Sequence, residues 1–168
     1  MIRAPGTRRA AVAMRLIRGA DDLRSRVRLV RYFAGSQVRK LLRLGPAERT
    51  RIHVSIGGIT WDVDTASSQL GGIHDVVLGG EYDAFDGFAA GPGAVVVDIG
   101  ANVGAYSLWQ AGNMRGVGTI VAVEASPSTV AVLRRNVAAN HAAVHIVESA
   151  VWSSTGTVEF VASERSSS

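Results

Sequence analysis

The sequence predicts an α/β fold of the Rossmann-like type, with a parallel sheet and flanking helices. Residues 94–98 form a short apolar run rich in β-branched side chains, which is typical of a strand buried on both faces of a parallel sheet. This run ends at Asp98 and opens onto a glycine-containing turn. A second apolar run, 119–123, ends at Glu124, 20 positions after Gly104. A strand, a glycine turn, a helix and a second strand that ends in an acid form the layout of a nucleotide-type cofactor site.

The other elements follow from periodicity and turn residues. We expect helices at 103–111 and 127–139, the second with Pro127 at its first position after a Ser126 cap. Two period-two runs that meet at Gly57-Gly58 predict a β-hairpin of residues 52–56 and 59–63. Residues 65–80 are expected to be rich in loops. Further expected elements are a short helix within 81–90 and strands at 144–148 and 157–161.

The N-terminal third carries a strong positive charge. Residues 1–51 hold 14 of the 18 Lys and Arg side chains but only three acids, a net charge of +11 against −7 for the remainder. A helix is predicted between an Asp21 or Asp22 cap and the Gly45-Pro46 stop, with an apolar stripe of Leu23, Val27, Val30, Ala34, Val38 and Leu41.

This basic helix has three alternative roles. It packs on its own domain with a charged face in solvent, it lies on an anionic membrane surface, or it contacts nucleic acid. Only Tyr32 and Phe33 interleave with the arginines, which argues against base stacking, so no nucleic-acid partner is expected. A peripheral membrane contact stays open.

Composition indicates one domain plus an extension. The chain has 168 residues, of which 47% are hydrophobic and 19% charged, and it has no cysteine, which fits a reducing cytoplasm. No apolar run approaches the roughly 20 residues of a membrane span. The basic start resembles a signal peptide, but Arg15 interrupts its apolar stretch, so we expect a cytoplasmic protein, with membrane association at most at the surface.

The turn after the first strand narrows the choice of cofactor. A dinucleotide site favours G-x-G-x-x-G, whereas this turn reads D-x-G-A-N-x-G with Asn102 at the place of the middle glycine. The Asp98 carboxylate is a poor neighbour for a diphosphate and a good one for a cation. S-adenosylmethionine, with a ribose, an amino group and no phosphate, fits better. Asp98 would hold the amino group, Gly100 and Gly104 would admit the methionine end, and Glu124 would accept from the ribose hydroxyls.

Four segments together resemble one known family. The run Val95–Leu108 is similar to motif I of the FkbM-type S-adenosylmethionine-dependent methyltransferases. Three further segments follow in the family's order, and the resemblance covers about residues 50–162. They are Gly80-Glu81-Tyr82 with Gly91-Pro92-Gly93, Val123–Pro127 with Leu133–Asn136 and Asn140, and Ala150-Val151 with Gly156–Phe160. The resemblance implies a class I methyltransferase that acts on a hydroxyl oxygen of a small molecule or sugar.

The expected cofactor-binding residues come from the strand ends, the glycine turn and the family segments. Glu148 and Ser149 follow the third strand near the expected adenine edge, and Glu81 or Tyr82 would close over the cofactor. No general base is identified, and no His or Cys cluster has metal-ligand spacing. Trp61, Trp109 and Trp152 are expected in the core. The full set of expected cofactor residues is Asp98, Gly100, Ala101, Asn102, Gly104, Glu124, Ala125, Glu148, Ser149, Glu81 and Tyr82.

One departure from the family leaves other functions open. The fold usually has a seven-stranded sheet, and this sequence runs only just past the predicted fourth strand. We therefore expect a basic, partly helical extension (1–50), a partial S-adenosylmethionine-binding domain (51–162) and a disordered tail (163–168). The alternatives are a non-catalytic cofactor-binding remnant and a nicotinamide-dependent oxidoreductase domain. An open sheet edge would allow a homo-oligomer.

Overall fold

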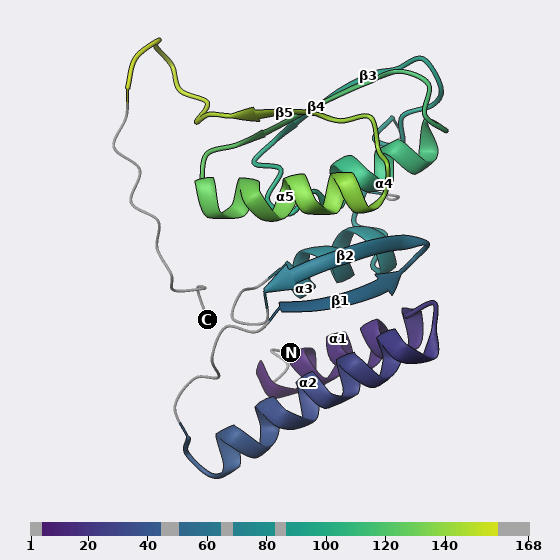
Figure 1. Ribbon diagram of the computed structural model, residues 1–168, viewed down its shortest axis with the longest axis vertical. Helices are drawn as coiled ribbons and strands as arrows, with labels where there is room; N and C mark the ends of the chain where they lie inside the picture. Colours follow the sequence, from purple (N-terminus) through teal and green to yellow (C-terminus); the bar gives the residue numbers. More distant parts are fainter. Residues whose placement is uncertain (1–4, 45–50, 65–68, 83–86, 158–168) are drawn as a thin grey trace. The chain divides into compact units, whose positions relative to one another are not determined.

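The chain divides into two compact units, residues 1–79 and 80–168 (Figure 1). The computed structural model describes residues 5–44, 51–64, 69–82 and 87–157. The β-hairpin belongs to the first unit with the basic helices, so this division differs from the expected boundary at residues 50 and 51. The reason is packing, because the hairpin lies against the second helix.

The first unit combines helices with a two-stranded antiparallel sheet. Strands β1 (Arg51–Ile56) and β2 (Ile59–Asp64) pair from Arg51 with Asp64 to Ile56 with Ile59, which confirms the predicted hairpin. Gly57 and Gly58 both have positive φ, 64° and 74°, as a two-residue hairpin turn requires. The helical elements are α1 (Pro5–Gly19), α2 (Leu23–Leu41), α3 (Gln69–Ile73) and the π-helix η1 (His74–Leu78).

A fully buried core holds the first unit together. Trp61 is its largest side chain, and its indole N–H donates to the Ile56 carbonyl at 3.3 Å. The expectation of loop over residues 65–80 is wrong for the described part, since α3 and η1 occupy it. The apolar end of η1 packs on α1, where Leu78 fills the space beside Gly19 and leaves no room for a Cβ. Tertiary packing therefore makes this segment helical.

The link between α1 and α2 confirms the predicted cap. The Asp22 carboxylate accepts hydrogen bonds from the Ser25 N–H at 2.8 Å and the Ser25 hydroxyl at 2.7 Å. These bonds hold the pKa of Asp22 below its usual value. The carboxylate of Asp21 accepts instead from Ser55 and from the Gly58 N–H, so it ties the helix start to the hairpin.

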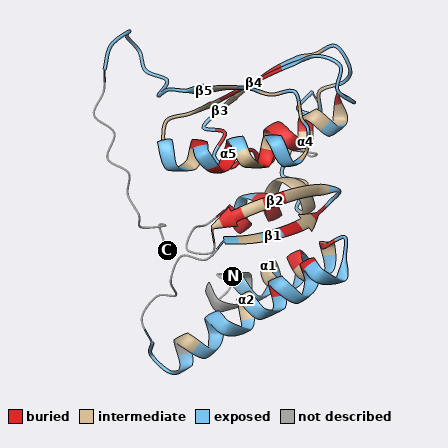
Figure 2. Ribbon diagram, viewed as in Figure 1, coloured by how far each residue is buried: buried red, intermediate tan, exposed pale blue. Residues whose placement is uncertain are grey.

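The bounds of α2 agree with the prediction, but the apolar stripe does not face the core. Ser25 and Leu29 are buried, whereas Leu23, Val27, Val30, Val38 and Leu41 are exposed (Figure 2). These two sets lie on opposite faces, because a helix turns 100° per residue. The helix does pack on its own unit, which is the first of the three alternatives, but its apolar stripe faces solvent together with charged groups.

The second unit is a three-stranded parallel sheet with helices, which confirms the predicted α/β fold. Strands β3 (Val95–Ile99), β4 (Thr119–Glu124) and β5 (His145–Glu148) lie in the order β3-β4-β5. Helix α4 (Ala105–Asn113) and helix α5 (Pro127–Ala139) connect them. Ser126 caps α5 as predicted, accepting from the Thr129 N–H at 3.4 Å.

Two predicted elements of this unit are not seen as expected. The described residues of 81–90, namely 81–82 and 87–90, form turns and bends rather than a helix. The predicted strand 157–161 lies, apart from its first residue, outside the described residues, as does the expected tail.

Both connecting helices cover the same face of the sheet (Figure 1). Ala101, Ala122 and Leu133 form one core cluster under them, and Val96, Met114 and Ile120 form another. The opposite face is open at β3, where Val95 is 73% exposed. A strand buried on both faces is therefore wrong for β3, because two successive right-handed crossovers place their helices on one side.

Candidate cofactor site

The carboxyl ends of β3 and β4 bring two acids together. Asp98 lies beside Ala122 in the register, and Glu124 is two residues further along β4. Side chains alternate along a strand, so both carboxylates project from the face that carries α4 and α5. Burial raises the pKa of Asp98 above its usual value, hydrogen bonds from Ser107 oppose that rise, and the negative charge of Glu124 adds to it. The two carboxylates, at the ends of neighbouring strands, are therefore close enough to repel each other.

Asp98 is anchored by the first turn of α4. Its Oδ2 atom accepts a hydrogen bond from the Ser107 hydroxyl at 2.6 Å, and Ser107 is fully buried. A negative charge at a helix N-terminus is stabilised by the free N–H groups there. Asp98 thus positions α4 and retains acceptor capacity for a ligand.

Glu124 ties the glycine turn to the start of α5. One carboxylate oxygen accepts from the Asn102 N–H at 3.0 Å and the other from the Ser126 N–H at 2.9 Å. Each oxygen has a second lone pair, so the carboxylate keeps room for two further donors. A pair of vicinal hydroxyls would supply two such donors.

Gly100 and Gly104 of the turn differ in what surrounds the position that a Cβ would take. Gly100, with φ of 77°, has no atom within 4 Å of where a Cβ would lie, so its surroundings are open. Gly104, with φ of 90°, would place a Cβ 2.7 Å from a methyl of the fully buried Leu133. The space on the Cβ side of Gly104 is therefore taken by the core, so packing requires a glycine at this position. Asn102 has φ of 50°, a left-handed conformation that asparagine tolerates.

Backbone and amide hydrogen bonds fix the shape of this turn. The N–H groups of Gly100 and Ala101 both donate to the Val123 carbonyl at 2.9 Å. From the other side, the buried Asn136 side chain donates to the Val103 carbonyl at 2.9 Å. Hydrogen bonds to β4, from α5 and to the Glu124 carboxylate therefore hold the turn without a ligand.

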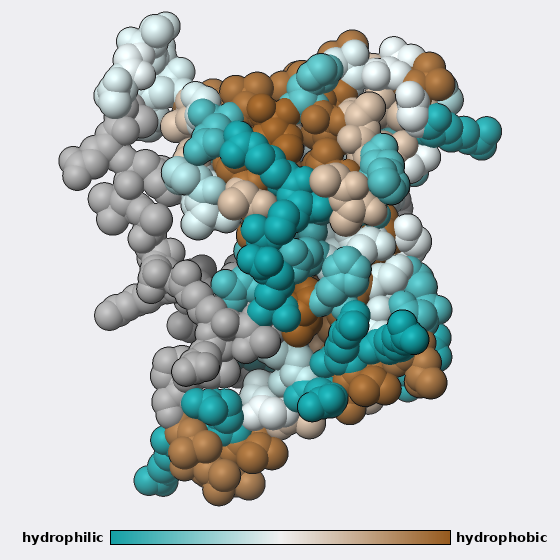
Figure 3. Space-filling view, viewed as in Figure 1, coloured by the Kyte–Doolittle hydropathy of each residue, from teal (hydrophilic) through white to brown (hydrophobic). Residues whose placement is uncertain are grey.

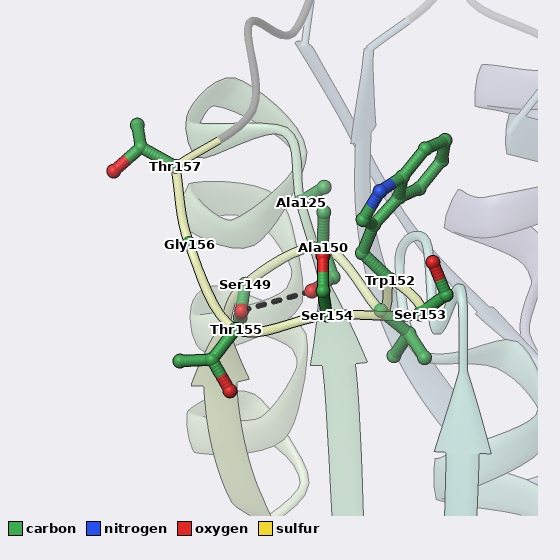
Figure 4. Close-up of a pocket in the computed structure, with 10 residues that line it drawn as sticks. Ala125, Ser149, Ala150, Trp152, Ser153, Ser154, Thr155, Gly156 and Thr157 are labelled. Atoms are coloured by element: carbon green, nitrogen blue, oxygen red, sulfur yellow. Dashed lines mark hydrogen bonds between the residues drawn. The ribbon is translucent and has the colours of Figure 1, made fainter.

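A cavity of about 650 Å³ adjoins the end of β4 (Figure 4). It is lined by Ala125 and by residues 149–157, and Ser149 donates from its hydroxyl to the Ala150 carbonyl at 3.1 Å. Trp152 lies on this wall and is 69% exposed, so the expectation that it belongs to the core is wrong. Trp152 lies in the segment after β5 and not within a helix or strand. This position in the sequence was the available sign that its side chain would not be part of the core.

Glu148 lies apart from this cavity. It pairs with Glu124 in the register of β4 and β5, yet its carboxylate forms an ion pair with Arg134 of α5 at 3.0 Å. Among the two acids at neighbouring strand ends, Glu124 holds the turn and Glu148 holds a helix. Of the predicted pair at the third strand, Ser149 alone adjoins the cavity.

Tyr82 packs on the exposed side of α4. Its ring centroid lies 4.6 Å from Tyr106, 5.7 Å from Phe88 and 6.4 Å from Trp109. Burial raises the pKa of Tyr82, and the negative charges of Glu81 and Asp98 raise it further. Tyr82 is therefore electrostatically coupled to Asp98, whereas Glu81 is exposed to solvent.

Sequence reasoning missed the polar residues of α4 that organise this region. Buried Gln110 accepts from the Ala90 N–H at 2.9 Å and donates to the Phe88 carbonyl, and the Tyr106 hydroxyl also donates to that carbonyl at 3.0 Å. Ser107 and Gln110 are three positions apart, so they share one face of the helix. In the sequence, these two residues could have been recognised as polar positions on a helix face that is otherwise apolar.

No protein-family model matches the sequence, and neither does any curated protein. Parts of solved structures are similar to it. The precorrin-6y C5,15-methyltransferase from Geobacter metallireducens is 28% identical over 37% of this chain and 33% of its own, with a TM-score of 0.35. M. jannaschii TYW2, crystallised with AdoMet, is 22% identical over 62% and 46%, with a TM-score of 0.49. The M. jannaschii tRNA m1G37 methyltransferase is 23% identical over 64% and 32%, with a TM-score of 0.44. This chain spans less than half the length of each of these three proteins.

Proposed function

We propose that the second unit binds S-adenosylmethionine and that the chain is an S-adenosylmethionine-dependent methyltransferase. The observation that carries the proposal is the pair Asp98 and Glu124, which project from adjacent parallel strand ends on the same face. Between them the chain turns at Gly100, where a ligand has open space.

The residues present fit the chemical groups of this cofactor. Glu124 retains one lone pair on each oxygen for the two ribose hydroxyls, after its bonds to Asn102 and Ser126. Asp98 offers a carboxylate to the positively charged amino group. Ala125 and Ser149 border the cavity where the adenine would lie, next to the ribose position.

The same residues argue against a dinucleotide. A pyrophosphate needs free N–H groups in the turn, but those of Gly100, Ala101, Asn102 and Gly104 are all bonded within the protein. Two carboxylates at this edge would also repel a diphosphate. The nicotinamide-dependent oxidoreductase is therefore the weaker candidate.

The chemistry requires alignment more than acid–base power. Bound S-adenosylmethionine supplies a sulfonium methyl group that a nucleophile attacks directly. The protein holds the amino group, the ribose and the adenine, and so fixes the methyl group relative to the acceptor. The resemblance of Gly80-Glu81-Tyr82 to the family segment implies that Tyr82 would cover the amino acid end of the ligand. Its ring contacts with Tyr106 and Trp109 hold it against α4.

For the acceptor we propose a hydroxyl oxygen of a small molecule or sugar, as in the FkbM-type family. The support is the similarity of Val95–Leu108 and the three further segments to that family. Methyl transfer from labelled S-adenosylmethionine to a panel of sugars and to tRNA tests this point. Transfer to tRNA alone would overturn the acceptor and the FkbM assignment while leaving the methyltransferase intact.

Calorimetry of the full chain tests the cofactor proposal. We expect a saturable signal with S-adenosylhomocysteine and none with NADH. A signal with NADH alone would favour the oxidoreductase, and silence with both would overturn the proposal. Binding of S-adenosylhomocysteine without methyl transfer to any acceptor would identify a non-catalytic cofactor-binding protein.

A further inference from the structure

Helix α2 has two opposite faces, and only one of them is covered. Ser25 and Leu29 are buried against the rest of the first unit, and the Ser25 hydroxyl accepts from the Ser55 N–H of β1 at 2.9 Å. The opposite face carries an apolar stripe that recurs every three or four positions. Val27 and Val30 in its middle are each 47% exposed, and Leu41 at its end is 82% exposed. The stripe comprises Leu23, Val27, Val30, Ala34, Val38 and Leu41.

The apolar surface continues past the end of the helix. Leu42 and Leu44 are both exposed, directly after the last turn of α2. Figure 3 shows hydrophobic side chains in the lower part of the view, one group at the lower left and another higher up at the right. An aliphatic surface of this length on one face of a single helix is uncommon on a protein that stays in water.

The charged side chains of this helix are all basic. Residues 23–41 contain five arginines, one lysine and no acid. Arg24 and Arg31 are exposed beside the stripe, whereas Arg26 and Arg28 donate hydrogen bonds back to the Ala20 and His53 carbonyls. The nearest acids, Asp21 and Asp22, are occupied by Ser55, Gly58 and Ser25. The helix itself therefore carries a net positive charge.

We infer that the exposed face of α2 docks on an anionic lipid surface, independently of the proposed cofactor chemistry. A lipid interface satisfies both observations at once, because the acyl region takes the aliphatic stripe while anionic headgroups take the arginines. A nucleic acid would pair with the arginines but leave the leucines and valines in water. Tyr32 and Phe33, the aromatic residues of α2, are half-buried with ring centroids 4.9 Å apart, so they offer no stacking surface.

A second copy of the chain is the other apolar partner to consider. Two α2 helices packed through their stripes would place their arginine flanks side by side, and no acid on this helix would compensate them. Like charges at such a seam oppose pairing. The charge pattern thus favours a lipid partner over self-association.

Co-sedimentation of the full chain with vesicles tests the inference. We expect binding to phosphatidylcholine vesicles that contain phosphatidylserine, and much weaker binding to phosphatidylcholine alone. The double variant Val27→Glu/Val30→Glu should abolish binding. Val117→Glu is the matched control, since Val117 is 57% exposed on a loop of the other unit and the same substitution there should leave binding unchanged.

A second pair of variants separates charge from apolar contact. Arg24→Gln/Arg31→Gln should weaken binding to the anionic vesicles by roughly 25-fold, about fivefold for each arginine lost near the surface. Circular dichroism should show native helix content and an unchanged melting temperature for all variants, because every substituted side chain is exposed. The S-adenosylhomocysteine calorimetry should be unaffected, so failure here is distinguishable from failure of the cofactor proposal.

Three outcomes would overturn the inference. The first is no sedimentation of the wild-type chain with anionic vesicles. The second is binding that survives Val27→Glu/Val30→Glu, which would assign it to charge alone, as for a nucleic-acid or polyanion surface. The third is a lipid-free dimer in analytical ultracentrifugation that the same double variant dissociates, with no vesicle binding, which would assign the stripe to a second copy.

Discussion

The Asn136 side chain donates a hydrogen bond to the Val103 carbonyl at 2.9 Å, and so joins the last turn of α5 to the turn that precedes α4. Asn136 is fully buried. A turn that is expected to receive a ligand is thereby held from its far side by an amide 33 residues away. The cofactor site consequently depends on residues that need never touch a ligand.

This hydrogen bond leads to a prediction about stability. Asn136→Ala removes the donor and leaves a buried carbonyl unsatisfied, so we expect about 1–3 kcal/mol of lost unfolding free energy. Urea denaturation measures it. Asn113→Ala in α4 is the matched control, because the Asn113 side-chain nitrogen is buried with no hydrogen-bond partner among the described residues and its loss should cost less. Equal losses in the two variants would contradict the role given to Asn136.

The two strand-end glutamates should differ in ligand binding. Glu124→Ala removes a charged acceptor of the ribose hydroxyls, and we expect S-adenosylhomocysteine affinity to fall by more than about tenfold. Glu148→Ala removes a carboxylate that is engaged by Arg134, and the affinity should change by less than about twofold. Calorimetry compares them. An unchanged affinity in Glu124→Ala would remove the ribose assignment.

Substitutions of the two glycines of the turn should have different effects on stability and on ligand affinity. Gly104→Ala brings a methyl group against buried Leu133 and also strains a positive φ, so we expect a loss of roughly 2–4 kcal/mol in unfolding free energy. Gly100→Ala meets only the strain, about 1–2 kcal/mol, but places its methyl group in the open space assigned to the ligand. For Gly100→Ala we expect the loss of binding free energy for S-adenosylhomocysteine to exceed the loss of unfolding free energy. If Gly100→Ala binds S-adenosylhomocysteine as the wild type does, the open space is not the ligand's.

Stability should respond to the titration of Asp98. The pKa of Asp98 is raised in the folded chain, mainly by burial, so the folded state holds this proton more tightly than the unfolded state does. The contribution of Asp98 to stability is then present below its unfolded pKa, and it is lost as the pH rises through the folded pKa. Asp98→Asn removes this dependence, so the stability of the variant relative to wild type should improve as the pH rises through that window. Urea unfolding across the acid range checks it, and a difference that is constant with pH would contradict the assignment.

The sequence predicts the second unit well because its signals are local. Each feature can be recognised from a few adjacent residues. These features are the apolar runs of β3 and β4, the Ser126-Pro127 start of α5 and the acid at the end of each strand. The helix at α2 was predictable for the same reason, since its bounds follow from caps and period. The hairpin followed from two adjacent glycines between alternating runs.

What the sequence could not give depends on tertiary contacts. The orientation of α2 is one case, because periodicity identifies an apolar stripe but not which of two faces meets the hairpin. Gly104 is another, since only the position of Leu133 shows that the core occupies its space. The partner of Glu148 is a third: Arg134 lies 14 residues away and meets it only after α5 has packed beside β5.

Glu124 anchors the backbone of the turn and Asp98 anchors the Ser107 side chain of α4, and both also face the proposed ligand. Selection on this protein therefore acts on two properties through the same atoms. A random screen for variants that no longer recognise the cofactor will recover misfolded chains from these two positions. Clean changes of specificity are to be sought at Ala125 and Ser149, whose side chains border the cavity without holding the turn in place.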